Sequence, residues 1–199
     1  MSFVHLHLHT QFSLLDGAIK LGDLIKRAKQ YEMPAVAITD HGNMFGAIKF
    51  YQMATRAGIK PIIGSEVYVA PKGREDRTVR KSYHLILLAK DLEGYHNLCR
   101  LSSIGYLQGF YYVPRIDWEV LQAHSKGLLC TTACMGGELG QSILRGDTDH
   151  ALKTAKEYDG LFGRGNYYLE LQQNGYPEQE KVNAELLNIS EITGIPVVA

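Results

Sequence analysis

The sequence lacks the features that would place the protein in a membrane or outside the cell. The chain has 199 residues, and none of its apolar runs approaches the roughly 20 residues that a membrane-spanning helix needs. Its first residues, Met-Ser-Phe-Val-His, do not follow the basic-then-apolar order of a secretory signal peptide. Three cysteines occur, an odd number without paired spacing, which argues against a disulfide framework. We therefore expect a cytoplasmic protein without a membrane partner.

The sequence also lacks an excess of either charge. Lys plus Arg number 21 and Asp plus Glu number 21, so the formal net charge is zero. This excludes a global basic field of the kind that recruits nucleic acid. No Walker loop or Rossmann glycine pattern is present, so a nucleotide-cradling loop is not expected. The composition, 45% hydrophobic and 21% charged, is that of an ordinary globular chain long enough for one large domain.

What is present is an alternation of strand-like and helix-like patterns. A period of two over residues 3–8 predicts a strand with three histidines on one face, and apolar spacings of three and four predict helices that begin near residues 21 and 47. Further strands are expected over residues 35–39, 61–69, 85–89, 127–133, 167–171 and 195–199. Further helices are expected over residues 91–107, 138–145, 150–162 and 178–192. The alternation predicts parallel strand pairing and an α/β fold, either an open doubly wound sheet or a closed barrel.

Two segments depart from this alternation. Residues 72–81 are dense in charge and have no periodicity, which predicts a solvated surface loop, with contact to an anionic polymer as the alternative. Residues 195–199 have the pattern of a buried strand with nothing after it. Because a natural domain seldom stops within its core, we expect the chain to be a fragment.

Chemically active side chains gather at the predicted strand ends. On a strand, residues two apart project from the same face roughly 6.5 to 7 Å apart, so His7 and His9 could bind one ion or two adjacent ions. The ends of other strands carry further potential ligands: Asp16, His41, Glu66, and Cys134 ahead of two glycines. Parallel strands collect their carboxyl ends at one rim, where such folds place their chemistry. His84 stands at the start of its strand, which is the wrong rim in this scheme.

Each of these residues also has a simpler interpretation. His7 and His9 could belong to a polar strand face, Asp16 and Glu66 could be capping or surface carboxylates, and Cys134 could be a small buried apolar residue. The pattern alone does not separate His5 from its neighbours. Together, however, imidazole, carboxylate and thiolate at successive strand ends are costly to bury unless they bind metal.

The mixed ligand set indicates a particular class of ion and of reaction. Nitrogen, oxygen and sulfur donors favour Zn²⁺, Mn²⁺ or Fe²⁺ over a site built only for Mg²⁺ or Ca²⁺. More than four ligands imply more than one ion. Two or three ions about 3.5 to 4 Å apart bind a phosphoryl group and generate hydroxide from water, which predicts phosphoester hydrolysis.

Several segments resemble one known family. FVHLHLHT at 3–10, SLLDG at 13–17, ITDHGNMFG at 38–46 and GIKPIIGSE at 58–66 resemble the PHP (polymerase and histidinol phosphatase) domain of the alpha subunits of bacterial DNA polymerase III. The resemblance continues through residues 84–90, 94–98, 109–111, 114–117 and 175–179 and covers essentially the whole chain. The opening motifs suit any PHP protein, and the later ones are particular to the polymerase.

The resemblance implies a distorted seven-stranded β/α barrel with a trinuclear metal centre, incomplete here at its C-terminal end. Carried over by position, the family's metal ligands are His7, His9, Asp16, His41, Glu66, His84 and Cys134. This selects His7 and His9 over His5 and restores His84. The implied cofactors are two or three divalent transition ions, Zn, Mn or Fe. The family completes its site with an Asp-x-His pair, which would lie beyond residue 199.

The resemblance also implies a role in DNA replication. The whole protein would be a DNA-directed DNA polymerase whose palm, thumb, fingers and Mg²⁺-binding carboxylates lie beyond residues 1–199, so this chain alone cannot extend a primer. The implied activity of the domain is metal-dependent 3′-5′ exonuclease action on a primer end. Its partners would be DNA and other subunits of the holoenzyme, among them a proofreading subunit and the sliding clamp. Two alternatives stay open: a non-catalytic scaffold in the same polymerase, and a stand-alone phosphatase similar to histidinol phosphatase.

Overall fold

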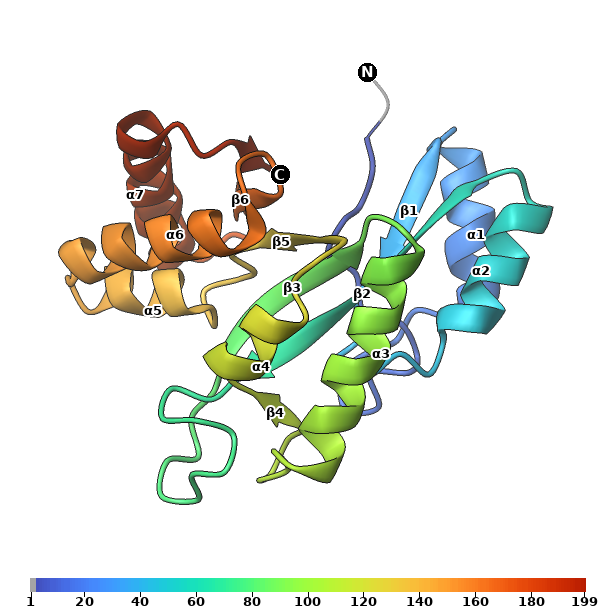
Figure 1. Ribbon diagram of the computed structural model, residues 1–199. Helices are drawn as coiled ribbons and strands as arrows, with labels where there is room; N and C mark the ends of the chain where they lie inside the picture. Colours follow the sequence, from blue (N-terminus) through green and yellow to red (C-terminus); the bar gives the residue numbers. More distant parts are fainter. Residues whose placement is uncertain (1–2) are drawn as a thin grey trace.

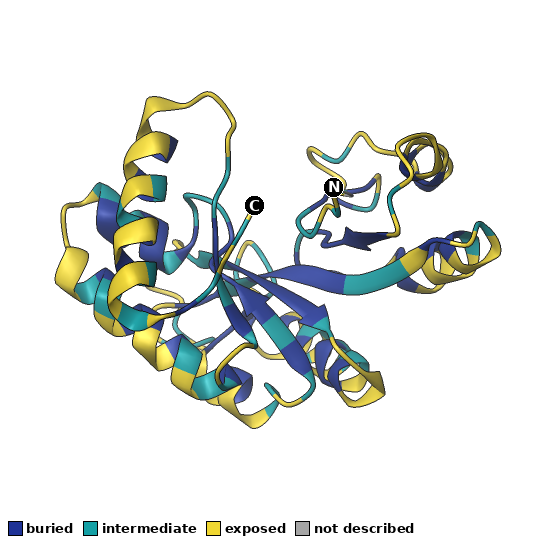
Figure 2. Ribbon diagram, turned by 90° about the horizontal axis from the view of Figure 1, so that it is seen from above, coloured by how far each residue is buried: buried dark blue, intermediate teal, exposed yellow. Residues whose placement is uncertain are grey.

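The fold is built around one curled sheet. The computed structural model describes residues 3–199. Its seven-stranded sheet has the order β1-β2-β3-β5-β6-β7, with β4 paired to β2. The strands are β1 (Ala35–Ile38), β2 (Lys60–Val69), β3 (Tyr83–Ala89), β4 (Arg115–Ile116), β5 (Leu128–Thr131), β6 (Tyr167–Glu170) and β7 (Val197–Val198). Figure 2 shows the helices outside the curl and an opening between the two chain ends. The structure is a half-barrel, in agreement with the expected α/β class.

The helices lie close to their predicted positions (Figure 1). They are α1 (Leu21–Gln30), α2 (Ala47–Arg56), α3 (Leu92–Leu107), α4 (Trp118–Ala123), α5 (Glu138–Leu144), α6 (Thr148–Phe162) and α7 (Pro177–Thr193). Asp91 begins α3 as an N-cap whose carboxylate accepts a hydrogen bond from the Gly94 N–H at 2.9 Å. The short elements β4 and α4 have no counterpart in the sequence prediction. No helix within residues 3–199 combines the length and the apolar character needed to cross a membrane.

The expectation of parallel pairing is wrong for β3. This strand pairs antiparallel with β2 on one side and with β5 on the other. Residues 70–82 join β2 to β3 without a helix, and a parallel connection needs a crossover of a dozen or more residues, usually helical. Because β3 runs in the opposite direction, its first residues lie at the rim formed by the carboxyl ends of β1 and β2. His84 is therefore at the same rim as the other potential ligands.

The two terminal strand predictions are also wrong in part. Residues 3–8 run beside β1 without forming a ladder: the Ala37 N–H donates to the His5 carbonyl at 2.9 Å and the Thr39 N–H to the Leu8 carbonyl at 2.8 Å. At the other end the strand is limited to β7, and Val197 is 39% exposed although Ile195 is buried. Between the two hydrogen bonds of the first segment the chain advances three residues, from His5 to Leu8, while its neighbour advances two, from Ala37 to Thr39, so the register slips and no ladder forms.

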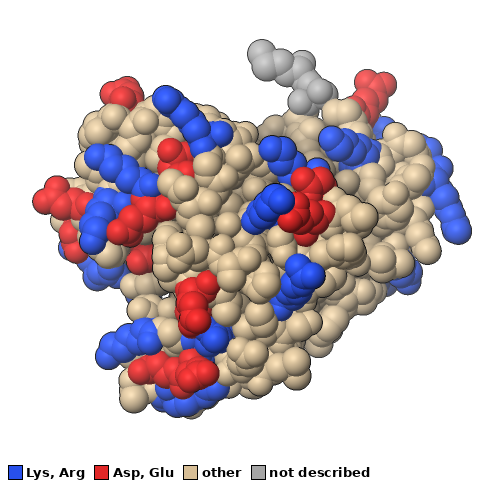
Figure 3. Space-filling model, in the orientation of Figure 1, with Lys and Arg blue, Asp and Glu red and all other residues tan. Residues whose placement is uncertain are grey.

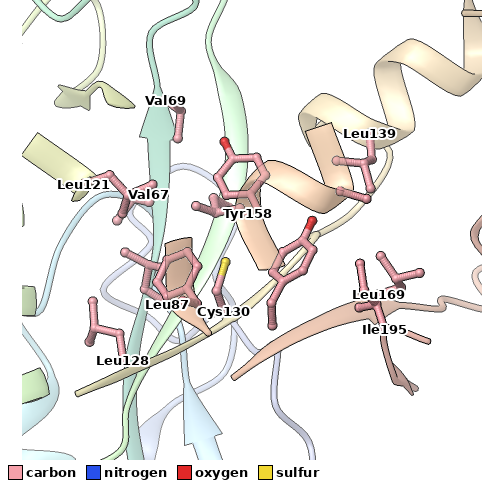
Figure 4. Close-up of a cluster of buried hydrophobic side chains, with 14 of the residues drawn as sticks. Val67, Val69, Leu87, Leu121, Leu128, Cys130, Leu139, Tyr158, Leu169 and Ile195 are labelled. Carbon is pink, nitrogen blue, oxygen red and sulfur yellow. The ribbon is translucent and has the colours of Figure 1, made fainter. Parts of the chain in front are cut away.

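The two faces of the sheet differ in character. The outer face packs against helices in a large apolar cluster that includes Val67, Leu87, Cys130, Tyr158 and Leu169 (Figure 4). The inner face has only a small apolar cluster of Ala37, Ile86, Leu88 and Ala133. Residues alternate between the faces because the side-chain period of a strand is two. The side chains of the inner face at the rim are polar, and they form the candidate site.

The charged segment 72–81 is a loop, as predicted, and it is attached to the body of the protein. Arg115 of β4 is 1% exposed. Its guanidinium donates hydrogen bonds to the backbone carbonyls of Arg74, Asp76 and Val79 at 3.0, 2.6 and 3.1 Å. One buried cation therefore organises a loop that has no helix or strand of its own.

Candidate metal centre

Glu66 lies at the centre of the cluster. It stands on the inner face of β2, and its side chain is 1% exposed. One oxygen, Oε2, lies 2.8 Å from His7 Nε2 and 3.6 Å from His9 Nε2. The other oxygen, Oε1, lies 2.8 Å from His41 Nδ1 and 2.9 Å from His84 Nδ1. Four histidines from three parts of the chain thus converge on one buried carboxylate.

His7 and His9 share a face although their segment is not a strand. Their Nε2 atoms lie 3.2 Å apart, and both approach the same oxygen of Glu66. The segment is fixed by Asp40 at the end of β1, whose carboxylate accepts hydrogen bonds from the Thr10 N–H and hydroxyl and from the Ser13 hydroxyl, at 2.6 to 2.8 Å. The alternation in the sequence therefore gave the right pair of neighbours, and Asp40 is a positioning residue that sequence reasoning passed over.

Cys134 belongs to the cluster through His84. Its Sγ lies 3.6 Å from His84 Nδ1 and accepts the Gly136 N–H at 3.3 Å. A Cβ atom added at Gly136 would lie 2.9 Å from the same His84 nitrogen. The glycine is required because the backbone passes so close to the imidazole.

Asp16 stands at the outer margin of the site. Its side chain is 60% exposed, and its Oδ2 lies 3.1 Å from His41 Nε2. All seven residues expected from the family resemblance are therefore in one place, whereas His5 lies apart on the wall of a neighbouring cavity. The remaining histidines, His96, His124 and His150, belong to neither donor set found among residues 3–199.

Glu170 is a buried member of the site that sequence reasoning missed. Its Oε1 lies 2.7 Å from His7 Nδ1 and accepts a hydrogen bond from Gln172 Nε2 at 2.7 Å, and its Oε2 accepts one from the Thr131 hydroxyl. It stands at the carboxyl end of β6, inside the strand expected over residues 167–171, so its position at a strand end is the sequence signal that points to it. Beside Glu170 and His7 a cavity of about 740 Å³ opens toward solvent.

The donor atoms fit bound metal better than they fit one another. Glu66 Oε1, His41 Nδ1 and His9 Nδ1 are buried and have no hydrogen-bond partner among residues 3–199, although Oε1 lies within 3 Å of two imidazole nitrogens. The atoms are close but not aligned for hydrogen bonds. Unpaired buried polar atoms are rare and need an explanation. Metal ions held by the residues of this cluster would provide one.

Two sets of donors converge closely enough to hold an ion each. His7, His9 and Glu66 form one, and Glu66, His84 and Cys134 form the other, with the ligand atoms of each set within 4.8 Å of one another. Glu66 is common to both sets. The sets combine imidazole, carboxylate and thiolate, the combination that suits borderline transition ions.

The cluster is also strongly polarised without metal. Burial disfavours ionisation of Glu66, but its contacts with His41, His7 and His84 outweigh burial and hold its pKa far below the usual value. Burial likewise opposes protonation of His7 and His84. Contacts with Glu170 and Glu66 outweigh burial at His7 and raise its pKa to about 10, and contacts with Cys134 and Glu66 do the same for His84, whose pKa is also raised to about 10. Burial and the neighbouring His41 lower the pKa of His9. The negative charge at the centre thus attracts cations, whether protons or metal ions.

Comparison with protein families and curated proteins gives consistent matches. The family model described as the PHP domain matches residues 5–174. The DNA polymerase III alpha subunit of Thermus aquaticus is 50% identical over 100% of the chain, and that of Borreliella burgdorferi is 49% identical over 99%. The subunit of Treponema pallidum is 48% identical over 100%. The chain spans about 17% of the length of each of these relatives.

Solved structures with a similar fold are much more distant in sequence. An amidohydrolase from Chromobacterium violaceum with bound sulfate superimposes with a TM-score of 0.61 at 14% identity, covering 98% of this chain and 84% of that one. A protein from Bifidobacterium adolescentis, whose name suggests a metal-dependent phosphoesterase, gives 0.62 at 14% identity, covering 98% and 85%. At this identity the likeness concerns the fold.

Proposed function

The chain belongs to the PHP domain family, as the PHP domain of a DNA polymerase III alpha subunit, and from this premise we propose that it is a metal-dependent phosphoesterase that removes nucleotides from DNA 3′ ends. The whole protein would carry out DNA-directed DNA synthesis, with primer DNA and other replication subunits as partners. The observation that carries the proposal is the convergence of four imidazoles on the buried carboxylate of Glu66, whose Oε1 has no hydrogen-bond partner among residues 3–199.

The proposed ligands are the residues that surround Glu66. His7, His9 and Glu66 would hold one divalent transition ion, and Glu66, His84 and Cys134 a second. His41 and Asp16 offer further donors at the margin, where a third ion could be held. Bound ions of this kind supply positive charge to a phosphoryl group and lower the pKa of water.

The protein's own residues supply order around this site. Glu170 fixes the ring of His7 through Nδ1, so that Nε2 faces Glu66. Carboxylate partners of this type orient ligand imidazoles and raise their basicity. Asp40 fixes the segment that carries both N-terminal histidines.

Two alternatives are less well supported. A stand-alone phosphatase does not account for relatives of which the chain spans only about 17%. A scaffold has no need for unpaired nitrogen and oxygen atoms in a buried cluster, since such atoms cost stability unless they bind something. The intact donor sets therefore favour the hydrolase over the scaffold.

The proposal is tested by metal content and by 3′-end trimming together. The protein, extended through the Asp-x-His pair that the family resemblance places beyond residue 199, is dialysed against Zn²⁺ or Mn²⁺. Its bound metal is measured by mass spectrometry, and it is then mixed with a primer that has a mismatched 3′ end. We expect about two ions per chain from the two donor sets and release of mononucleotides. The double variant His7→Asn/His9→Asn should lose at least one ion and all trimming.

A matched control is His96→Asn, which alters an exposed histidine on α3. This variant should retain both the metal and the trimming. Full metal content without trimming would favour the scaffold. Trimming by the double variant would show that the nuclease activity does not reside at this site.

A further inference from the structure

A row of exposed aromatic rings lies at the same rim as the cluster. Phe45 precedes α2, Tyr106 lies in the last turn of α3, and Phe110 follows that helix. The ring centroids of Phe45 and Tyr106 are 6.3 Å apart, and those of Tyr106 and Phe110 are 6.1 Å apart and stacked. The three side chains are 62, 40 and 51% exposed. Each of the three rings therefore keeps surface that a ligand can contact.

The row continues into a pair of tyrosines that carry arginines. Arg80 lies 4.1 Å from the ring centre of Tyr112, and Arg77 lies 5.8 Å from that of Tyr111. Tyr112 is 59% exposed and has a φ of +64°. A non-glycine residue in the left-handed region is strained by about 1 kcal/mol or more, and such strain is concentrated at functional positions. Here it holds a ring at the surface beneath a guanidinium.

The neighbouring loop contributes positive charge. Residues 72–81 contain five basic and two acidic side chains. Asp76 is occupied within the loop by hydrogen bonds from Thr78, and Arg74 is paired with Asp117 and Glu119. In Figure 3 this loop forms the charged corner at the lower left, next to an uncharged surface. Four exposed cations, Lys72, Arg77, Arg80 and Lys81, thus remain beside the aromatic row.

The aromatic row connects to the candidate centre through Tyr68. This ring stacks on His41 at 6.1 Å and meets His84 edge-on at 5.3 Å. Gly42, next to His41, has no room for a side chain, because a Cβ would come within 2.7 Å of Pro114 and 3.2 Å of Tyr68. The loop that carries Phe45, the segment that carries Phe110, and the donor cluster are therefore in continuous contact.

We propose that Phe45, Tyr106 and Phe110, together with Arg77 and Arg80, bind a single strand of DNA and lead its end to the donor cluster. We call these five residues the aromatic strip. Exposed rings interleaved with cations are the arrangement that binds single strands without sequence preference, since every base stacks and every phosphate carries charge. The inference rests on the proposed function and specifies how the same site receives its substrate.

The test is direct binding of fluorescein-labelled oligo(dT) to the chain, followed by anisotropy in the presence of a chelator. The triple variant Phe45→Ala/Tyr106→Ala/Phe110→Ala should bind at least tenfold more weakly, because stacking on one ring alone changes affinity by about fivefold or more. The double variant Arg77→Gln/Arg80→Gln should reduce the slope of log affinity against log salt by about 1.4, which corresponds to about 0.7 for each phosphate that the protein no longer neutralises.

The matched control is Tyr31→Ala. Tyr31 is 59% exposed and lies 5.7 Å below Arg27, but it precedes β1 and so stands at the opposite end of the strands. Its loss should leave affinity unchanged. Circular dichroism and urea unfolding test whether each variant is folded. If the triple variant is unfolded, the salt slope of the arginine variant tests the proposal.

Two outcomes overturn the aromatic strip. Equal affinity in all variants would show that the surface docks something else, such as another protein segment, and an equal loss in Tyr31→Ala would show unspecific adsorption. Because the chelator prevents hydrolysis, the two proposals fail separately. If the unmodified protein trims DNA but all variants bind oligo(dT) equally, the aromatic strip is refuted and the proposed function stands. If the strip variants bind weakly but the unmodified protein does not trim DNA, the proposed function is refuted and the aromatic strip stands.

Discussion

The two faces of the sheet place opposite chemistries on adjacent residues. On β2, Glu66 faces the donor cluster and Val67 faces the large apolar cluster. On β3, His84 and Leu85 divide in the same way. The register pairs Val67 with Leu85 and Glu66 with Ile86, so the division is maintained across both strands. A shift of one residue would exchange the faces, which is why this register is strongly specified.

The comparison teaches where the free energy of folding and the binding capacity come from. The outer face removes apolar surface from water, at roughly 1.5 to 3 kcal/mol for each fully buried Leu, Val or Phe side chain. The inner face lowers the stability of the metal-free protein, because it buries carboxylate and imidazole groups whose burial is unfavourable without partners. If this division holds, stability and metal affinity can be changed separately.

The largest effect is expected from a cavity on the outer face. Leu87 is fully buried between the helices and the sheet, so Leu87→Ala should lower the free energy of unfolding by about 2 to 5 kcal/mol. Urea denaturation of the metal-free protein measures this loss. The metal affinity of the folded variant, measured under native conditions, should stay within about threefold of the original, because Leu87 belongs to the outer apolar cluster. A tenfold change would correspond to about 1.4 kcal/mol.

Leu92→Ala is the matched control for Leu87→Ala. Leu92 is 69% exposed at the start of α3, and its truncation should change stability by less than about 0.5 kcal/mol. A tenfold loss of metal affinity in the folded Leu87 variant would show that the two faces are coupled, and the comparison would then break down.

The next effect is expected on the inner face, at Glu170. The variant Glu170→Gln keeps the size of the side chain but removes the charge that fixes His7. Loss of such a carboxylate partner weakens metal binding by about 10- to 100-fold. Titration against a chromophoric chelator measures the change. Glu138→Gln is the control, because Glu138 is a mostly buried carboxylate in the outer helical layer that accepts a hydrogen bond from the Tyr158 hydroxyl. If both variants lost the same metal affinity, the effect would not come from the orientation of His7.

The sequence predicts the outer face better than the details of the inner one. Apolar spacing identifies the helices and the long strands, since the outer cluster is formed by those same apolar residues. The convergence of His7, His9, His41 and Glu66 also follows, because strand ends meet at one rim. The direction of β3 was predicted wrongly, although the missing helix between residues 70 and 82 was a signal for a hairpin.

Other parts of the inner face depend on contacts that no local pattern encodes. Glu170 is 163 positions from His7 in the chain and meets it at 2.7 Å. Residues 3–8 carry a strand pattern, but they exchange hydrogen bonds with Ala37 and Thr39 without forming a ladder. The alternation predicted which side chains lie together and could not predict how the backbone is paired.

The smallest effect on stability is expected at Tyr167 in the outer cluster. Tyr167 is fully buried, its hydroxyl has no hydrogen-bond partner among residues 3–199, and burial raises its pKa well above the usual value. The folded protein therefore keeps this proton above about pH 10, where the unfolded chain loses it, so stability falls as the pH rises, by up to about 1.4 kcal/mol per pH unit for one tyrosine.

Tyr167→Phe should remove this contribution and flatten the alkaline loss of stability. At neutral pH the variant should be as stable as the original or slightly more so, because an unpaired buried hydroxyl is removed. Urea unfolding between pH 9 and 11 measures the slope, with Tyr31→Phe as a control whose hydroxyl belongs to an exposed side chain. Because Tyr167 faces away from Glu66, the same substitution should leave metal affinity at neutral pH unchanged, and a change there would show that the outer cluster also tunes the inner site.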